Sequence, residues 1–369
     1  MRNYLLFLAL IFAPFNCLAK TQNLQDFGLA ISEKTPAFAM LIVQNGKTLV
    51  KNTDGCARLD GKAKKCTLKA NNDTAFAIAS VTKHFTAAGI LMLEEDGKLS
   101  IEDEISKYLG LPAQFQGVKI KHLIFHTSGI PNYSWGDDGD EEIFLKNGKK
   151  ITADEAILKI FQREFKPRDV EFAYSNSGYT LLGKIIEKVS GKSYESFMKE
   201  RIFNPLGMKN TFVTTSIEAQ KNYTFQYSAW PILQEQIWQK VDELTSEGGI
   251  WTSINDYEKW LRAFDNNKIF QKKTTMEKFL SHGKHDSGKN VIPDGEVEMN
   301  YGFGIGHKNA EKFKGKAYKI ITHNGGMPGT AALFGKILDK NIWLVYFNNN
   351  GAYPQAFELL EATGVNFDS

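Results

Sequence analysis

Residues 76–86 read FAIASVTKHFT, and the rest of the chain is organised around this stretch. A short apolar segment precedes Ser80, and residues 81–95 are rich in helix formers up to Gly97, which predicts a helix there. Lys83 follows Ser80 by one helical turn, so its amine can take the proton of a serine nucleophile, provided that burial lowers the lysine pKa. Free N–H groups at the helix start would stabilise an oxyanion. Alone, the pattern also fits a helix start with a surface lysine, so its meaning depends on motifs further along.

The bulk composition indicates an exported globular protein. The chain has 369 residues, of which 42% are hydrophobic, enough for one large or two interleaved domains. The net charge is +3 and the lysines are scattered among acidic residues, which disfavours nucleic acid or an anionic membrane as a partner. Residues 1–19 are typical of a signal peptide, with Arg2, a short apolar run and Ala19 for cleavage. We therefore expect a periplasmic or secreted protein with no transmembrane segment after cleavage.

The three cysteines of the chain give further indications about anchoring and about the redox state of the compartment. Cys17 follows the apolar run and leaves lipoprotein anchoring open, although the preceding Pro14-Phe15-Asn16 disfavours it. After cleavage Cys56 and Cys66 remain, flanking a polar, lysine-rich loop. In an oxidising compartment we expect them to form a disulfide, with two free thiols as the alternative.

Possible metal ligands lack the spacing that a metal site needs. The acidic run 137–142 does not have the alternating ligands of an EF-hand loop. His282, His285 and Asp286 lie in a Gly- and Lys-rich loop without further ligands nearby in the sequence. We therefore expect no metal and no cofactor.

Periodicity and turn residues predict strands towards both ends of the chain and helices between them. Asn45-Gly46 joins two strands in a hairpin, and Gly191 ends an amphipathic helix that begins near Tyr179. Further strands are expected at 75–77, 301–307, 318–323, 330–337 and 341–347, and further helices at 24–32, 118–125, 194–203 and 354–363. Helices are also expected after the capping pairs Ser100/Asp103, Thr152/Glu155 and Ser253/Asp256.

This order predicts an α+β (mixed α/β) fold. An antiparallel sheet flanked by helices would be built from both ends of the chain, because sequential antiparallel strands need only short links. We expect residues 20–99 and 250–369 to form the α/β sheet domain, and residues 100–249 to form an inserted, mostly helical domain.

Two further motifs change the meaning of the Ser80 stretch. Tyr174-Ser175-Asn176 precedes a helix, and His323-Asn324-Gly325 ends a strand. With Ser80 and Lys83, this set resembles the penicillin-recognising serine enzymes, specifically the branch of class C β-lactamases, D-alanyl-D-alanine carboxypeptidases, D-aminopeptidases and esterases. The stretches 123–130 (LIFHTSGI), 248–253 (GGIWTS) and 301–304 (YGFG) also resemble that family. The likeness covers about residues 37–348 and implies a β-lactamase/transpeptidase-like fold.

The resemblance implies a role for each motif residue. Ser80 would attack a carbonyl, and Lys83 would accept or relay its proton. Tyr174, its pKa lowered by the lysine, would act as general base and then as acid, so the division of proton transfer between the two stays open. Asn176 would hydrogen-bond the substrate amide or the lysine. The N–H groups of Ser80 and Gly326 would form the oxyanion hole.

The third motif departs from the Lys-Thr-Gly of β-lactamases. Lysine there is a cation that attracts a substrate carboxylate, whereas His323 would be mostly neutral near pH 7. The histidine is shared with esterase and D-aminopeptidase-like relatives, so the resemblance favours substrates without an obligatory carboxylate. His323, Asn324 and Gly325 are then expected to contact the substrate.

Together these features predict an exported serine hydrolase that forms an acyl-enzyme at Ser80. Small esters or D-amino-acid peptides and amides are the expected substrates. A class C β-lactamase or a D-Ala-D-Ala carboxypeptidase is the alternative, and a catalytically idle sensor of penicillin or peptidoglycan is a third possibility. The chain lacks the Gly-x-Ser-x-Gly motif, which argues against an α/β-hydrolase.

Overall fold

The computed structural model describes residues 36–60, 65–133, 160–228, 234–235, 245–293, 299–327, 329–352 and 356–365. Several expectations lie outside these residues. They are the signal peptide 1–19 with Cys17, the helix at 24–32, the acidic run 137–142 and the Thr152/Glu155 cap.

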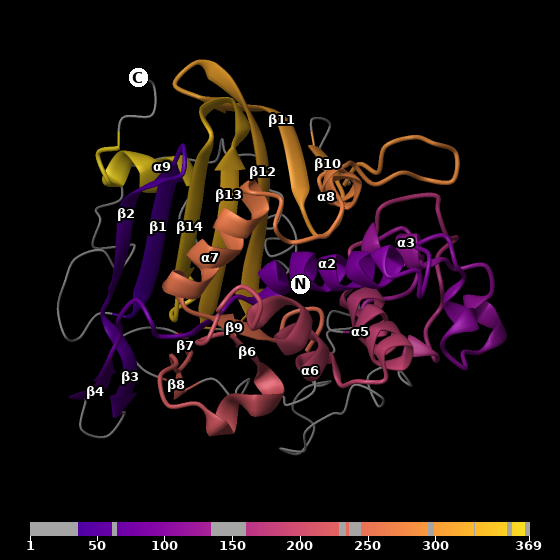
Figure 1. The fold of residues 1–369 in the computed structure, drawn as a ribbon, viewed down its shortest axis with the longest axis horizontal. Helices are drawn as coiled ribbons and strands as arrows, with labels where there is room; N and C mark the ends of the chain where they lie inside the picture. The colour runs from indigo at the N-terminus through magenta and orange to yellow at the C-terminus, as the bar shows by residue number, and fades with distance from the viewer. Residues whose placement is uncertain are drawn as a thin grey trace.

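A seven-stranded antiparallel sheet forms one side of the molecule in Figure 1 and a group of helices forms the other. Its strand order is β10-β11-β12-β13-β14-β1-β2, so the first strand lies between its hairpin partner and the last strand. The bounds are β1 Phe38–Gln44, β2 Lys47–Asp54, β10 Met299–Tyr301, β11 Gly306–Phe313, β12 Lys316–Met327, β13 Thr330–Ile337 and β14 Ile342–Asn348. The expected sheet built from both ends of the chain, and with it the fold class, is confirmed.

The β1–β2 hairpin turns at Asn45 and Gly46, whose φ angles of 51° and 76° fit a tight turn between antiparallel strands. β1 is buried on both faces of the sheet. Ala39, Leu41 and Val43 belong to one core, and Phe38, Met40 and Ile42 belong to another. This alternation explains the continuous apolar sequence of β1.

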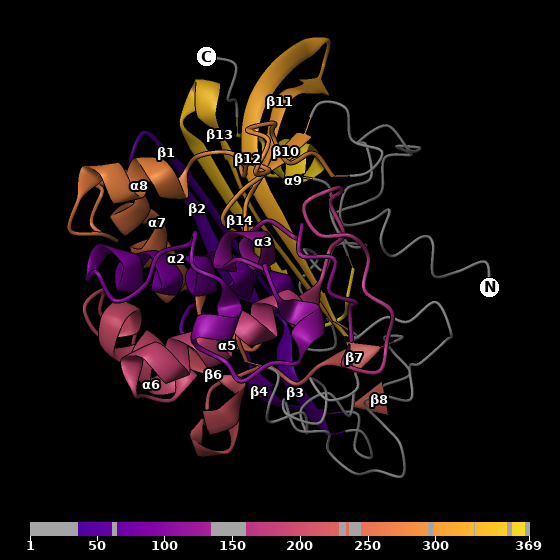
Figure 2. The ribbon, with the colours of Figure 1, turned by 90° about the vertical axis from the view of Figure 1, so that its right-hand side faces the viewer.

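Helices cover both faces of the sheet (Figure 2). α2 (Thr82–Glu95), α7 (Ile254–Asp265) and α8 (Lys273–Phe279) lie on one side, and α9 (Ala356–Ala362) lies on the other. Phe357, Leu359 and Leu360 of α9 complete the second core. The helices expected at 81–95, after Ser253 and at 354–363 are confirmed, whereas α8 had no clear sequence signal.

α2 is the central helix, with every residue from Thr82 to Leu93 buried. α5 (Asn176–Ser190) packs along it and ends at Gly191, which adopts a left-handed φ of 69° as expected. α3 (Ile120–Ile124) and α6 (Tyr194–Met198) pack on α5, and α6 continues as a π-helical turn, Lys199–Phe203.

Small strands and turns complete the described structure. A three-stranded sheet has the order β5-β9-β6, with bounds Phe76–Ala77, Ile250–Thr252 and Phe212–Val213. A two-stranded ribbon pairs β7 (Tyr227–Ser228) with β8 (Gln234–Glu235). Single 3-10 turns occur at Ala79–Val81, Ile105–Lys107, Ala113–Phe115, Thr214–Ala219 and Leu338–Lys340.

Two expectations about local structure are wrong. Ser100 N–H does bond the Asp103 carboxylate at 2.9 Å, but only 3-10 turns follow, at 105–107 and 113–115. Glu104 is extended and pairs with Lys119, and the backbone of residues 101–105 hydrogen-bonds residues 118–121, so no regular helix forms there.

The second wrong expectation is that the segment between Cys56 and Cys66 forms a loop. It is a hairpin of β3 (Cys56–Asp60) and β4 (Lys65–Lys69), in which exposed and half-buried residues alternate along β4. A disulfide joins Cys56 and Cys66 across the two strands. Closing a loop of this size contributes about 2–3 kcal/mol by loop entropy.

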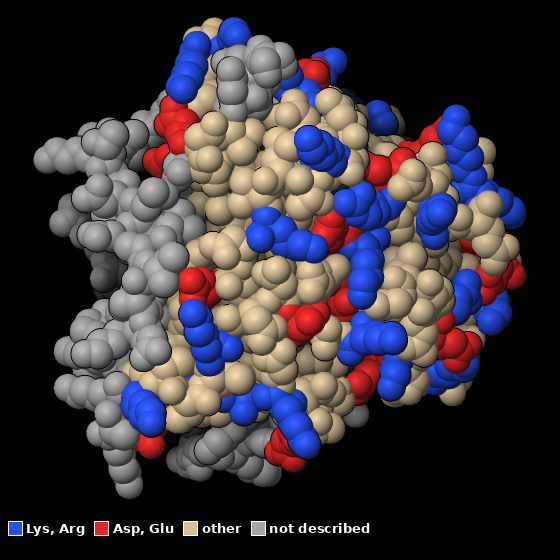
Figure 3. Space-filling view, turned by 60° about the vertical axis from the view of Figure 1, so that its left-hand side comes forward, with Lys and Arg blue, Asp and Glu red and all other residues tan. Residues whose placement is uncertain are grey.

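The surface shown in Figure 3 carries lysine and arginine interspersed with aspartate and glutamate. Among the described residues, Arg201 contacts Asp96 at 2.6 Å and Lys278 contacts Glu94 at 2.6 Å. Within the described ranges, no helix has the length and apolar character needed to cross a membrane.

Candidate active site

Ser80 lies in a strained turn between β5 and α2. Ala79 has φ 45°, in the left-handed region that residues with a Cβ rarely adopt. The turn is held by Ile78, whose N–H bonds the Ile250 carbonyl of β9 and whose carbonyl accepts from Val81 N–H, both at 3.1 Å. Ser80 stays partly exposed while its neighbours are buried. The backbone therefore presents this hydroxyl at the edge of the core.

Lys83 lies fully buried one turn further on, with three polar neighbours. Its Nζ is 3.0 Å from Ser80 Oγ, 2.7 Å from Asn176 Oδ1 and 2.7 Å from the main-chain oxygen of Glu247. The last two oxygens can only accept hydrogen bonds. A neutral amine therefore donates its two N–H groups to them, and its lone pair faces the Ser80 hydroxyl. This is the geometry that a general base needs.

Burial lowers the pKa of Lys83 to about 7, although the negative charge of Glu247 opposes the shift. Both the neutral and the charged amine are thus populated near neutral pH. This agrees with the pKa shift expected for a buried lysine at this position.

Tyr174 packs beside the lysine, with Nζ 4.9 Å from its ring centroid. Burial raises the pKa of Tyr174 above its ordinary value, and interaction with Ser80 opposes that rise only partly. The expectation that the lysine would lower this pKa is wrong, because desolvation of the phenolate dominates and the Glu247 charge adds to the rise. Tyr174 is therefore a neutral phenol at neutral pH, and of the pair only Lys83 changes charge there.

Asn176 begins α5, where the Ser175 side chain caps the helix by accepting Gly178 N–H. The backbone N–H of Asn176 donates to Asn132 Oδ1 at 3.1 Å, and this bond fixes Asn176 at the helix start. The sequence left the substrate amide and Lys83 as possible partners of the Asn176 side chain, and in the structure this side chain contacts Lys83.

The third motif lies on β12, which passes directly over the Ser80 turn. A Cβ atom on Gly325 would overlap the Ile78 carbonyl oxygen and lie 3.2 Å from the Ser80 nitrogen. Only glycine therefore allows this approach. Gly326 follows on the same strand, opposite Ala331 of β13, and is partly exposed.

His323 is buried on β12 and is held in one tautomer. Its Nδ1 is 2.6 Å from the Asn324 carbonyl oxygen and its Nε2 is 3.1 Å from the Tyr301 hydroxyl. Since a carbonyl only accepts, Nδ1 carries the proton and Nε2 accepts from the phenol. Burial and the Lys83 charge lower the pKa of His323 to about 3. The ring is therefore neutral near pH 7, as expected.

Sequence reasoning missed Glu247 and Tyr133, which both lie in the core of this site. The Tyr133 hydroxyl donates to Glu247 Oε1 at 2.6 Å, and both side chains are buried. Burial raises the pKa of the Glu247 carboxyl. The sequence offers only a weak signal, because a glutamate directly before Gly248-Gly249 resembles a solvated loop residue.

The acidic and histidine residues around position 286 form an ion-pair network away from Ser80. Asp286 Oδ1 is 2.6 Å from Lys121 Nζ, and Asp169 Oδ1 is 3.0 Å from His285 Nδ1. His122, Asp169 and Asp286 lie close enough to share a metal ion. However, His122 Nδ1 accepts the Lys119 N–H, so the proton sits on Nε2, the nitrogen that faces the carboxylates. These contacts fit ion pairing better than metal ligation.

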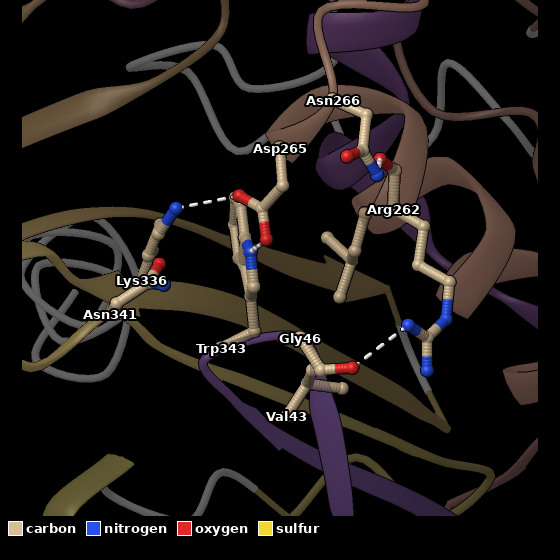
Figure 4. A pocket seen from close by; sticks show the side chains of 9 residues that line it. Val43, Gly46, Arg262, Asp265, Asn266, Lys336, Asn341 and Trp343 are labelled. Carbon is tan, nitrogen blue, oxygen red and sulfur yellow. Dashed lines mark hydrogen bonds and ion pairs between the residues drawn. The ribbon is translucent and has the colours of Figure 1, made fainter.

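A pocket of about 270 Å³ lies between α7 and the sheet (Figure 4). Its charged side chains pair with neighbours: Lys336 with Asp265 at 2.6 Å, and Arg262 with the Gly46 carbonyl at 2.9 Å. The indole of Trp343 also donates to Asp265. None of the motif residues lines this pocket.

With this geometry in place, comparison with known proteins identifies the family. The Beta-lactamase family model matches residues 20–363. The chain belongs to the beta-lactamase family. A penicillin-binding protein of Bacillus subtilis is 32% identical over 353 residues, which cover 89% of this chain and 72% of the relative.

Solved structures of other proteins share the fold. The octameric penicillin-binding protein homologue from Pyrococcus abyssi has 27% identity and a TM-score of 0.74, over 91% of this chain and 75% of that one. A D-amino acid amidase from Ochrobactrum anthropi SV3 has 23% identity and a TM-score of 0.67, over 89% and 93% of the two chains.

Proposed function

We propose that this beta-lactamase family protein is a serine hydrolase that works through an acyl-enzyme at Ser80. The observation that carries the proposal is the buried Lys83 amine, whose two obligate acceptors direct its lone pair to Ser80 Oγ. Oγ attacks the substrate carbonyl carbon and its proton passes to Nζ. The N–H groups of Ser80 and Gly326 bind the oxyanion. Collapse expels the protonated leaving group, and water then hydrolyses the Ser80 ester.

Tyr174 is proposed to relay the proton from Lys83 to the leaving group. A neutral phenol can give its proton to the departing atom while it regains one from the ammonium beside it. We expect Tyr174→Phe to lower kcat by about 10²-fold and to change KM little, because the lost step occurs in the transition state. Steady-state kinetics on a chromogenic ester measure both constants. An equal loss in kcat and in substrate affinity would contradict the relay.

The pH dependence of acylation follows from the lysine. Only the neutral amine accepts a proton, and the pKa of Lys83 is lowered to about 7. We expect kcat/KM to fall as the pH drops below this value and to level off above it. A pH profile on an uncharged ester measures this limb directly. A flat profile from pH 5 to 8 would show that Lys83 is not the base.

We propose small esters or D-amino-acid peptides and amides as substrates. The neutral, buried His323 supports this choice, because it offers no permanent cation to a substrate carboxylate. The fold shared with a D-amino acid amidase is compatible with it. The penicillin-binding relative favours the alternative, a β-lactamase or a D-Ala-D-Ala carboxypeptidase.

One preparation assayed with p-nitrophenyl acetate, a D-amino-acid amide, a D-Ala-D-Ala peptide and nitrocefin separates these substrate classes. Faster turnover of the first two supports the proposal, and faster turnover of the last two supports the alternative. Intact-mass spectrometry after a fluorophosphonate or penicillin probe tests catalytic competence. Absence of any adduct would indicate an idle binding protein.

We further propose that the protein is exported, with residues 1–19 as signal peptide, and the Cys56–Cys66 disulfide supports an oxidising compartment. We also propose the division into a sheet domain, 20–99 with 250–369, and an insert, 100–249. On this division the sheet domain supplies Ser80 and Lys83, and the insert supplies Tyr174 and Asn176.

A further inference from the structure

Glu247 is a buried acidic residue whose main-chain oxygen contacts Lys83, and only 4% of the residue is exposed. Its neighbour Gly248 lies against the Ser80 turn, where a Cβ would be 3.7 Å from the Ala79 carbonyl carbon. A buried carboxylate is costly unless a hydrogen bond or a counter-charge compensates it. The position therefore calls for a physical explanation.

Two contacts fix Glu247 in place. Its main-chain oxygen accepts from Lys83 Nζ at 2.7 Å, and its Oε1 accepts from the Tyr133 hydroxyl at 2.6 Å. One residue thus orients the lysine through its backbone and holds a negative charge nearby through its side chain.

The charge of Glu247 and the charge of Lys83 each oppose the pKa shift that burial causes in the other group. Burial raises the pKa of the Glu247 carboxyl, while the Tyr133 hydrogen bond and the Lys83 charge oppose the rise. Burial lowers the pKa of Lys83, while the Glu247 charge opposes that shift. Each ion therefore stabilises the charged form of the other.

The other titratable groups around this pair are all uncharged near neutral pH. Tyr133, Tyr174 and Tyr194 face Glu247, and burial raises the pKa of each phenol. His126 and His323 face Lys83, and burial lowers the pKa of each ring. Glu247 is the acidic group whose negative charge acts on Lys83 in this part of the described structure.

We infer that Glu247 is a positioning residue for the Ser80–Lys83 pair: its carboxylate, held by Tyr133, supplies the negative charge that decides when Lys83 holds a proton. This inference rests on the proposed acyl-enzyme function and deepens it. Proton transfer from Ser80 creates an ammonium ion at the buried Lys83, and a fixed carboxylate stabilises that ion as the oxyanion forms. The carboxylate itself contacts Tyr133, so it would act through Lys83 and not on the substrate directly.

Glu247→Gln in the full chain tests the inference, because the amide keeps an acceptor for Tyr133 and removes the charge. The protein is labelled with 13Cε-lysine, and the Lys83 NMR signal is assigned by its loss in Lys83→Met. Removal of the anion disfavours the ammonium ion, so we expect the Lys83 titration midpoint to fall by about one pH unit. The acid limb of kcat/KM should move to lower pH by the same amount.

Asp256→Asn is the matched control, since Asp256 is a buried carboxylate on α7 that pairs with Lys259 instead. It should leave the Lys83 midpoint unchanged. Tyr133→Phe is a second variant, and by removing the donor to Oε1 it should lower the midpoint by less than Glu247→Gln does. An unchanged midpoint in Glu247→Gln, or an equal shift in Asp256→Asn, would overturn the inference. The NMR result needs no turnover, so it stays separate from a failure of the proposed hydrolase activity.

Discussion

Ser80→Ala is expected to reduce hydrolysis of a chromogenic ester by at least about 10³-fold, because no other group can form the covalent intermediate. The same substitution should abolish the mass adduct with a fluorophosphonate probe. Folding should be preserved, since Ser80 is partly exposed and the change removes only one oxygen atom. Initial rates and intact-mass spectra on the purified protein measure both effects.

Ser106→Ala provides the matched control. Ser106 is an exposed serine in a 3-10 turn, so the same atom is removed outside the candidate site. Its rate and adduct yield should equal those of the unmodified protein. Retention of full hydrolysis by Ser80→Ala would refute the proposed function.

The second large effect is expected for Lys83→Met. Methionine has a similar volume but no base, so acylation should slow by about 10²- to 10⁴-fold. The change also removes the donor to Asn176 Oδ1 and to the Glu247 carbonyl, and an unsatisfied buried acceptor costs about 1–3 kcal/mol. Thermal unfolding should therefore shift to lower temperature. Single-turnover acylation and circular dichroism measure the two consequences separately.

Lys121→Met is the control that separates the effect of Lys83→Met on acylation from its effect on folding stability. Lys121 is also mostly buried, and it pairs with Asp286 at 2.6 Å in the network away from Ser80. Its loss should lower stability and leave the rate of acylation unchanged. Acylation by Lys83→Met at the rate of the Lys121→Met variant would exclude the lysine as base.

Much of the fold could be read from the sequence where local signals agree with burial. The Asn45-Gly46 turn and the apolar run of β1 specify the hairpin, and Gly191 marks the end of α5. The β3–β4 hairpin was missed because lysines dominate its exposed face and conceal the alternation. The absent helix after Ser100 shows the opposite case, in which the capping contact forms but the backbone of residues 101–105 bonds residues 118–121 instead of continuing as a helix.

From the sequence, only those residues of the site that belong to recognisable motifs could be predicted. Ser80 and Lys83 are one turn apart, so their contact follows from helix geometry alone. The pKa of Tyr174 depends on how much water reaches the phenol, which depends on distant segments packing around it. For the same reason Glu247 could not be recognised, since 164 positions separate it from the lysine that its carbonyl contacts.

The pairing of β1 with β14 has a consequence for how the protein reaches this structure. Ala37 beside β1 bonds Asn349 after β14 across 312 positions, so the centre of the sheet closes only after residue 349 has been synthesised. Contacts of such high sequence separation slow folding and leave apolar strand edges open to aggregation meanwhile. A chain emerging from a ribosome or a translocation channel therefore holds β1 unpaired on one edge until its last strand arrives, an interval in which a chaperone could bind.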